Sequence, residues 1–277
     1  MNPPRIVILI LNWNGREMLR DCLVSLADVS YSNYSILVVD NGSSDQSSAM
    51  VRQDFPQVEL LCLKDNCGYA RGNNAGWQHL ISDPPDMVLF LNNDTRVSPD
   101  FLDKFATDVA QADQLYIRGP KIHYAEPPDR LWFAGGIITL TQGFVAHRGI
   151  REIDRGQYDT PETTAYITGC CLLIDWNHLV ALNGFDEKFG MYAEDVDLCL
   201  RAQKMGIQCR YVPGALIWHR VSASLGGEFR WAKQHRKFRA LVRLIRRHLP
   251  LPKQIPAIMR MAFTGLIRIV ELFFIKR

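Results

Sequence analysis

Three carboxylates fall within four residues at Glu194, Asp195 and Asp197, in a segment that is otherwise rich in leucine. Crowding of like charges and partial burial both raise the pKa of a carboxyl group, and a raised pKa suits a carboxylate that removes a proton. The glycine-flanked segment 184–190 directly before them predicts a loop that holds the cluster at the mouth of a site. The alternative interpretation is an acidic helix start whose carboxylates complement the helix dipole.

Polar residues also follow three apolar segments that are predicted to be buried strands. These segments are residues 5–11, 35–39 and 87–91. Because ligands of open α/β sheets bind beyond the carboxyl ends of the strands, we expect a ligand site at this edge. Turn and helix caps explain one or two such residues, whereas three groups in register favour a ligand site. The polar residues concerned are Asn12, Asn14, Asp40, Asn41, Asn93 and Asp94.

Helix-forming segments alternate with strands in the first part of the chain. This alternation predicts an α/β fold, with a mostly parallel sheet flanked by helices on both faces. The expected helices run from Gly15 to about Leu26, from a cap at Ser43 or Ser44, over 70–81 and from Ser98-Pro99, and a further strand spans 58–63.

The pattern changes after residue 120, where glycines punctuate shorter segments. The expected elements are a hairpin or extended excursion around 135–143, a mobile polar surface loop over 146–163, a strand at 166–174, a short helix capped by Asp175, a helix over 192–205, and strands at 208–212 and 215–218.

The charge of the chain is divided unevenly between two parts. The 277 residues carry a net charge of +3, but residues 228–277 hold 13 lysines and arginines against two glutamates, a balance of +11. Residues 1–227 hold 19 basic against 27 acidic residues, a balance of −8. We therefore expect an acidic body over 1–227 and a basic tail over 228–277 that meets an anionic surface. The acidic body argues against nucleic acid as a partner.

The cysteines predict a reducing compartment. There are seven, and no two of them form a C-x-x-C pair, so free thiols are expected and a zinc ribbon is not. The apolar stretch at residues 6–11 is too short for a signal peptide. We therefore expect a cytoplasmic protein.

The basic tail is predicted to form two amphipathic helices. Apolar residues keep helical spacing over 238–249, and residues 257–275 are almost wholly apolar. In the second segment Arg260, Arg268 and Glu271 fall within one narrow stripe, which favours a helix lying in a membrane surface over a spanning helix. The tail is therefore expected to place the protein at the inner face of the cell membrane. The alternative is that its helices pack on the body or join a second subunit in a homo-oligomer.

Six segments of the chain occur together in the order and spacing of a known family. As a set they resemble the family 2 glycosyltransferases, in particular the rhamnosyltransferase-like branch. The resemblance covers residues 5 to about 222 and implies a single nucleotide-sugar-binding catalytic domain of the GT-A fold, which inverts the anomeric carbon. The segments are residues 11–15 (LNWNG), 38–45 (VVDNGSSD), 66–76 (NCGYARGNNAG), 91–95 (LNNDT), 184–201 (GFDEKFGMYAEDVDLCLR) and 217–222 (IWHRVS).

The resemblance implies roles for the polar residues. Asp195 is the expected general base, which removes the proton of the acceptor hydroxyl, and Glu194 shapes its surroundings. Asp40 is expected to accept hydrogen bonds from the base or ribose of the donor, and its alternative role is the acceptor of an Asx turn. The backbone amides of segment 66–76 and the side chain of Arg71 are expected to hold the diphosphate. The remaining donor-binding candidates are Asn12, Asn14, Asn41, Asn66 and Asn93.

A metal site is expected at Asp94. The family carries its D-x-D metal motif at this place, but here Asp94 is the single carboxylate. A divalent ion on a diphosphate is held by one or two carboxylates together with phosphate oxygens and water, so one carboxylate can suffice. His219 resembles a later motif that returns to the metal, and its alternative role is that of a packed histidine beside Trp218. The expected cofactor is Mn²⁺ or Mg²⁺, and an imidazole ligand favours Mn²⁺.

The sequence therefore predicts an inverting hexosyl- or deoxyhexosyltransferase of polysaccharide biosynthesis. It would move a sugar, with rhamnose as the candidate, from a nucleoside-diphosphate donor to a hydroxyl of a glycan or lipid-linked acceptor. One alternative is a nucleotidyltransferase, for which a glycine- and lysine-rich loop is expected after the first strand, where only Gly15 and Arg16 occur. The other is a non-catalytic membrane-associated adaptor, against which Asp40, Asp94 and Asp195 argue.

Overall fold

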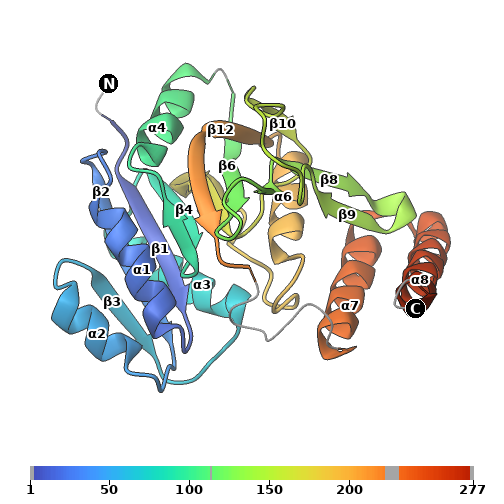
Figure 1. Cartoon of the computed structure of the whole chain (residues 1–277), viewed down its shortest axis with the longest axis horizontal. Coiled ribbons are helices and arrows are strands. Elements are labelled where there is room, and N and C mark those ends of the chain that lie inside the picture. Colours follow the sequence, from blue (N-terminus) through green and yellow to red (C-terminus); the bar gives the residue numbers. More distant parts are fainter. Residues whose placement is uncertain (1–2, 113, 222–230, 275–277) are drawn as a thin grey trace.

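The computed structural model describes residues 3–112, 114–221 and 231–274, and Figure 1 shows their arrangement. In the first part of the chain, strands and helices alternate as the apolar pattern predicts. The elements are β1 (Ile6–Asn12), α1 (Arg16–Ala27), β2 (Tyr34–Asn41), α2 (Ser47–Asp54), β3 (Glu59–Leu63), α3 (Tyr69–His79), the 3₁₀ turn η1 (Leu80–Ser82), β4 (Met87–Asn92), β5 (Thr95–Val97) and α4 (Phe101–Gln111).

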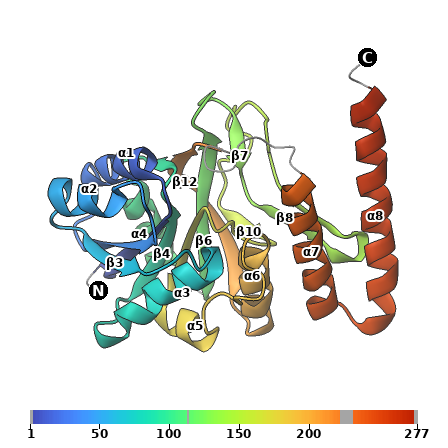
Figure 2. The same cartoon turned by 90° about the horizontal axis from the view of Figure 1, so that it is seen from below.

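Strand β1 lies inside a sheet that has ten strands in the described part of the chain. It pairs in parallel with β2 and β4, and β2 pairs in parallel with β3. Ile8 and Leu9 of β1 are fully buried, because helices cover both faces of the sheet. Figure 2 shows α1 on one side and α3 on the other. The predicted α/β fold with a mostly parallel sheet is therefore confirmed.

The second part of the chain completes the sheet. β6 pairs in parallel with β12, and β11 lies antiparallel between β6 and β4. β8 and β9 form a separate hairpin, which confirms the hairpin predicted around 135–143. The elements are β6 (Tyr116–Tyr124), β7 (Leu131–Phe133), β8 (Gly136–Thr139), the 3₁₀ turn η2 (Leu140–Gln142), β9 (Phe144–His147), β10 (Glu162–Thr164), β11 (Cys171–Asp175), α5 (Trp176–Ala181), α6 (Glu194–Lys204) and β12 (Gln208–His219).

Strand β6 has no apolar signature because it buries charged side chains. Arg118 Nε lies 2.8 Å from Asp108 Oδ2, and Lys121 Nζ lies 2.8 Å from Asp154 Oδ2. Partners of opposite charge make such burial tolerable, and those partners are remote in the sequence. The Lys121 pair also ties the segment 146–163 to the sheet, where the sequence pattern predicts a mobile surface loop.

Two helix starts differ from the predicted positions. α2 begins at Ser47, and not directly after Ser43 or Ser44, because the Ser43 hydroxyl accepts a hydrogen bond from the Asn14 amide at 2.9 Å. α4 begins only after Asp100, two residues beyond the cap expected at Ser98. By contrast, the Asp175 side chain accepts hydrogen bonds from the first amides of α5, as predicted.

Three further boundaries differ for local reasons. β11 starts at Cys171 and not at 166, because a turn precedes it. β12 is one strand where two are predicted, and its register with β6 shifts between Val212 and Leu216. The last helix begins at Leu251, before the predicted start at 257, and it includes Pro252 in its first turn, where a missing N–H breaks no helical bond.

Two helices, α7 (Trp231–His248) and α8 (Leu251–Phe274), follow the sheet. α7 packs on the body through Ala240 and Leu244, which belong to the main core. α8 packs on α7 through a second, small core of Ile245, Ala257 and Met261. Figure 2 shows α8 at the edge of the molecule, beyond α7. Neither these helices nor any other in the described residues has the combination of length and apolar character that crossing a bilayer requires.

Candidate active site

The carboxyl ends of β1, β2 and β4 bring predicted donor-binding residues together. The parallel register pairs Asn12 with Asp40, and Asn12 Nδ2 lies 3.4 Å from Asp40 Oδ1. Asn93 donates to Asn12 Oδ1 at 2.6 Å. Asp40 also accepts a hydrogen bond from Ser43 N at 3.3 Å, so the turn-forming role left open by the sequence is present. A carboxylate offers about four acceptor positions, so Asp40 retains capacity for a ligand.

Asn14 fastens the end of β1 to the loop after β2. Its backbone is left-handed, with a φ of 48°, a conformation that asparagine tolerates better than most residues. The Asn14 amide donates to Ser43 Oγ at 2.9 Å, and Asn14 Oδ1 accepts from Ser44 N at 2.8 Å. Asn14 and Ser43 therefore shape the loop that borders Asp40.

The glycine-rich segment before α3 is held in place by two asparagine side chains. Asn41 donates to Asn66 Oδ1 at 3.0 Å, and Asn41 Oδ1 accepts from Cys67 N at 3.0 Å. Asn66 Oδ1 accepts from Gly68 N at 2.9 Å. Because these backbone N–H groups already have partners, the segment offers fewer donors to a diphosphate than its sequence predicts.

Arg71 extends from the first turn of α3 towards solvent. Its Nε lies 2.9 Å from Glu187 Oε2, and its side chain is 64% exposed. Ala70 N donates to Gly190 O at 3.1 Å, so the start of α3 is joined twice to the loop before α6. An exposed ion pair contributes little to stability, so Arg71 can exchange Glu187 for a phosphate at small cost.

Asp94 and His219 meet just beyond the end of β4. The pairing of β5 with β12 sets Thr95 opposite His219, and His219 Nε2 lies 3.1 Å from Asp94 Oδ1. The side chains are only 8% and 10% exposed, respectively. The contact has ion-pair distance without hydrogen-bond geometry. Asp94 Oδ1 is buried and receives no hydrogen bond from the residues that the structure describes. A buried, unsatisfied carboxylate oxygen that faces an imidazole fits the ligand set of a cation.

Asp94 and His219 would supply two protein ligands to such a cation. Within the described ranges, no three or more His, Cys, Asp and Glu side chains are grouped to hold a metal. The other coordination positions would therefore fall to phosphate oxygens and water, which is the usual arrangement for a divalent ion on a diphosphate.

Trp132 forms a wall beside this pair. Its ring stands edge-on to the ring of His219 and also to that of His147, with 4.4 Å between ring centres in each case. Burial lowers the pKa of His147 to about 4, so this second imidazole is neutral at physiological pH. Nothing in the sequence pattern singles out His147, because its partners come from other strands.

Asp195 lies in the first turn of α6 and faces a backbone amide. The chain enters α6 through Tyr192 and Ala193, with φ values of 80° and 64°, a strained conformation for residues that have a Cβ. Asp195 Oδ2 accepts from Gly169 N at 2.8 Å, and Oδ1 accepts from Val196 N at 2.8 Å. Strained backbone next to a polar side chain is concentrated at functional sites.

Glu194 and Asp195 differ in how strongly each carboxyl group holds its proton. Burial raises the pKa of both, and the pKa of Glu194 rises further because Glu194 also feels the negative charge of Asp195. Glu194 Oε2 is buried without a hydrogen-bond partner in the described residues, whereas two amides favour the ionised form of Asp195. The pair therefore loses its first proton from Asp195 while Glu194 stays neutral, which suits Asp195 as a base.

A turn at Gly169 and Cys170 places the two halves of the site on one edge. Gly169 donates to Asp195, and Cys170 O accepts from Asn92 N at 2.9 Å at the end of β4. Burial is the main cause of a raised pKa of the Cys170 thiol, and the negative charges of Asp94 and Asp195 raise this pKa further. The predicted metal ligand and the predicted base are therefore within electrostatic reach of the same buried group.

A cavity of about 440 Å³ lies beside this edge, between α1, β5 and the end of β12. Asp94 is on its wall, together with Asp21 and Arg220, which form an ion pair at 3.0 Å. Neither Asp40 nor Asp195 lines it. The cavity is therefore next to the metal-binding candidates but is not the space between donor and base.

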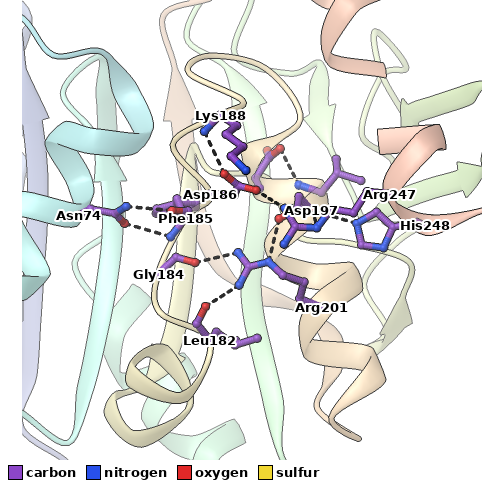
Figure 3. A network of polar contacts seen from close by, with 12 residues as sticks. Asn74, Leu182, Gly184, Phe185, Asp186, Lys188, Asp197, Arg201, Arg247 and His248 are labelled. Carbon is purple, nitrogen blue, oxygen red and sulfur yellow. Dashed lines mark hydrogen bonds and ion pairs between the residues drawn. The ribbon is translucent and has the colours of Figure 1, made fainter. Parts of the chain in front are cut away.

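Asp197, the third carboxylate of the cluster, fastens α7 to α6 (Figure 3). Its side chain is fully buried and lies 2.7 Å from Arg201 Nε, 2.8 Å from His248 Nε2 and 3.2 Å from Arg247 Nε. Arg247 also pairs with Asp186, in the loop before α6. We refer to Asp197, Arg201, Arg247 and His248 as the α7 clamp, which joins the last turn of α7 to the segments that carry the candidate base.

We expect His248→Ala to lower the free energy of unfolding by about 1–3 kcal/mol, because buried Asp197 loses a hydrogen-bond donor. Urea denaturation measures the change, and exposed His235→Ala on the same helix is the matched control, with an expected change below about 0.5 kcal/mol. Burial alone would raise the pKa of Asp197, but the hydrogen bonds from His248 and Arg201 have the larger, opposite effect. The pKa of Asp197 is therefore lowered. The clamp therefore stabilises the protein at neutral pH, and this contribution is lost as the pH falls through the lowered pKa. Equal stability of the two variants would contradict the clamp.

The chain belongs to the glycosyltransferase-like family 2, because the family model matches residues 3–247. It is 27% identical over 238 residues to the N-acetylglucosaminyl-diphospho-decaprenol L-rhamnosyltransferase of Mycobacterium tuberculosis. The alignment covers 79% of this chain and 77% of that protein. It is 21% identical over 224 residues to the dTDP-rhamnosyl transferase of Shigella flexneri, with 78% and 69% of the two chains covered. The predicted family is therefore confirmed, and the protein is a glycosyltransferase.

The fold is shared with solved glycosyltransferases. The mannosyltransferase of Pyrobaculum calidifontis in complex with GDP-Man and Mn²⁺ superposes with a TM-score of 0.63 at 16% sequence identity, over 95% of this chain and 70% of that one. A likeness at this identity concerns the fold alone. It confirms the predicted GT-A architecture.

Proposed function

We propose that this glycosyltransferase inverts the anomeric carbon of its donor in a single displacement, with Asp195 as the general base. The proposal is supported by two features at the same edge of the sheet. The Gly169 amide donates a hydrogen bond to Asp195 and so favours its ionised form, and Asp94 Oδ1, which has no hydrogen-bond partner in the described residues, faces His219. A displacement of this kind needs a base for the attacking hydroxyl and positive charge for the leaving group. Both candidates occur at this edge.

In the proposed step, the acceptor hydroxyl oxygen bonds to the anomeric carbon as the bond from that carbon to the diphosphate oxygen breaks. Asp195 takes the hydroxyl proton, and the nucleoside diphosphate leaves with the bonding electrons. Mn²⁺ or Mg²⁺, when bound, would neutralise charge on the departing diphosphate. Asp94 and His219 would hold that ion. Neutral Glu194 adds no charge that would oppose ionisation of the base.

The polar edge at β1 and β2 is the proposed donor site. Asp40 would accept hydrogen bonds from the base or ribose, and the side chains of Asn12 and Asn93 would orient it. Arg71 would leave Glu187 to meet the diphosphate. The remaining donor-site residues, which hold the flanking loops, are Asn14, Asn41 and Asn66.

We further propose rhamnose as the transferred sugar and a glycan or lipid-linked acceptor in polysaccharide biosynthesis. Two of the similar proteins carry rhamnose in their names, and the name of the Mycobacterium tuberculosis protein includes a decaprenol-linked diphosphate sugar. Use of a lipid-linked acceptor would place the enzyme in the cytoplasm at the inner face of the cell membrane.

A donor panel tests the proposed transfer. The full chain is incubated with uridine, thymidine and guanosine diphosphate sugars, with Mn²⁺, Mg²⁺ or chelator, and release of nucleoside diphosphate is measured. We expect thymidine diphosphate rhamnose to be hydrolysed fastest in the presence of an ion. Asp40→Ala is expected to weaken binding of this donor by about tenfold, because a hydrogen-bonding charge is removed.

Three outcomes of the panel would count against the proposal. Turnover of no donor would overturn it, and a product that retains the donor's anomeric configuration by NMR would overturn the inverting step. Formation of pyrophosphate from a nucleoside triphosphate and a sugar phosphate would instead identify a nucleotidyltransferase.

A further inference from the structure

Four large apolar side chains form a row along the outer face of α8. Leu251, Ile255, Met259 and Phe263 are spaced four residues apart, which places them on one side of the helix. They are 79%, 69%, 67% and 65% exposed, respectively, the highest exposures among large apolar side chains of the described residues. We call these four residues the α8 apolar row. Contiguous exposed apolar surface of this kind typically marks an interaction site.

The orientation of α8 is fixed by its opposite face. Ala257 and Met261 are buried against Ile245 of α7. Gln254 donates to Leu249 O at 2.9 Å, and Arg260 Nη1 lies 3.3 Å from Thr141 O in the turn before β9. The α8 apolar row lies on the face of α8 opposite Ala257 and Met261, and Phe263 at its end borders Gln142. Figure 2 shows α8 itself at the edge of the molecule.

The part of the chain that contains α8 is positively charged. The sequence from residue 229 to residue 270 contains eleven lysines and arginines and no aspartate or glutamate. On α8, Lys253 and Arg260 are exposed. At 100° per residue they lie beside the row, between it and the face that packs on α7. Long basic side chains at the border of an apolar face can reach phosphate groups while the face is buried in acyl chains.

We propose that the α8 apolar row seats α8 in the plane of an anionic lipid bilayer. The row supplies apolar burial, and Lys253 and Arg260 meet lipid phosphates at its border. A second copy of this chain fits less well, because two such rows in contact would bring Lys253 and Arg260 of both copies together, and the sequence has no aspartate or glutamate between residues 229 and 270 to pair with them. The proposal goes beyond glycosyl transfer, and its link to a lipid-linked acceptor rests on the proposed function.

Docking through α8 would also set the position of the active site. α8 packs on α7, and the α7 clamp ties the last turn of α7 to Asp197, two residues after the candidate base. The short packed path from α8 to Asp195 would keep the base at a constant height above the bilayer. A lipid-linked acceptor would then reach it without further search through solution.

Sedimentation with vesicles tests the proposal. The full chain is mixed with vesicles of phosphatidylcholine alone or of phosphatidylcholine with phosphatidylglycerol, and the bound fraction is measured at low and high salt. We expect binding to the anionic vesicles that falls with salt, since each engaged basic residue contributes about fivefold to partitioning. The triple variant Ile255→Gln, Met259→Gln and Phe263→Gln should lower it by about tenfold or more.

A matched variant controls for the loss of exposed apolar surface in general. Ile81, Leu115 and Met205 are 59%, 53% and 51% exposed on other elements, and their combined change to glutamine should leave vesicle binding unchanged. Lys253→Glu with Arg260→Glu should reduce binding to the anionic vesicles and weaken its salt dependence. Hydrolysis of the donor by water should be the same in all variants, which shows that each is folded.

Equal vesicle binding by the wild type and the α8 triple variant would overturn the proposal. It would also be overturned if the triple variant changed an oligomer into a monomer while neither form bound vesicles, because the row would then cover a second subunit. Vesicle binding without donor hydrolysis would instead leave the α8 proposal standing and contradict the proposed function.

Discussion

Asp195→Asn is expected to lower the rate of sugar transfer by roughly 10²–10⁴-fold, the usual contribution of a positioned general base. The asparagine keeps the size of the side chain, and its single oxygen can accept from one of the two amides, Gly169 N or Val196 N. Folding and donor binding should therefore be preserved. Transfer is measured at saturating donor, and donor affinity is measured separately by calorimetry. Near wild-type turnover would eliminate Asp195 as the base.

Glu194→Gln is the matched control for this result. Because burial and the charge of Asp195 raise the pKa of Glu194 well above its usual range, glutamine copies the protonated form of this side chain, and activity should fall far less than in Asp195→Asn. Burial raises the pKa of Asp195, so the acidic limb of the wild-type pH profile should lie above that of an ordinary aspartate. Activity should rise with pH through this limb, because only the ionised carboxylate accepts the proton.

Asp94→Ala should lower transfer by about 10²-fold or more in Mn²⁺ or Mg²⁺, since a bound cation stabilises the leaving charge by several kcal/mol. Calorimetry should show weaker binding of the nucleoside diphosphate with the ion present and little change in chelator. Asp21→Ala is the matched control, because Asp21 lines the same cavity and should leave both quantities unchanged.

Full activity of the wild type after exhaustive treatment with chelator would refute the metal site. The leaving charge would then fall to Arg71, whose exposed pair with Glu187 is free to exchange. In that case Arg71→Ala, and not Asp94→Ala, would show the large loss of transfer. The two variants therefore separate a metal-assisted reaction from one assisted by arginine.

Much of the sheet and part of the site could be predicted from the sequence. The runs that form β1, β2 and β4 are uninterrupted and apolar because these strands are buried on both faces. Parallel strands end on the same side of a sheet, so the positions of Asn12, Asp40 and Asp94 at one edge followed from the alternation of elements. These features depend on local pattern and on rules of topology, which a single sequence contains.

The remaining features depend on partners that are remote in the sequence. Gly169 meets Asp195 across a gap of 26 residues, and only a turn before β11 makes this contact. Arg247 and His248 belong to the basic tail, in which the sequence indicates no partner for them, whereas the fold sets them against buried Asp197. Such pairs have no periodic signature, since each side chain is satisfied by tertiary structure alone.

The α7 clamp also separates the helix that belongs to the catalytic domain from the helix that another segment can replace. α7 contributes Leu244 to the main core, and the family match extends to residue 247. Packing therefore argues for extending the predicted catalytic domain of residues 1–227 to the end of α7. In the described side chains, α8 adjoins it through a small core whose buried members are Ile245, Ala257 and Met261, so another helix in place of α8 would leave the base supported. Under the bilayer-docking role that we propose for α8, relatives of this enzyme would acquire new destinations by exchanging one helix, without renewed selection on the chemistry.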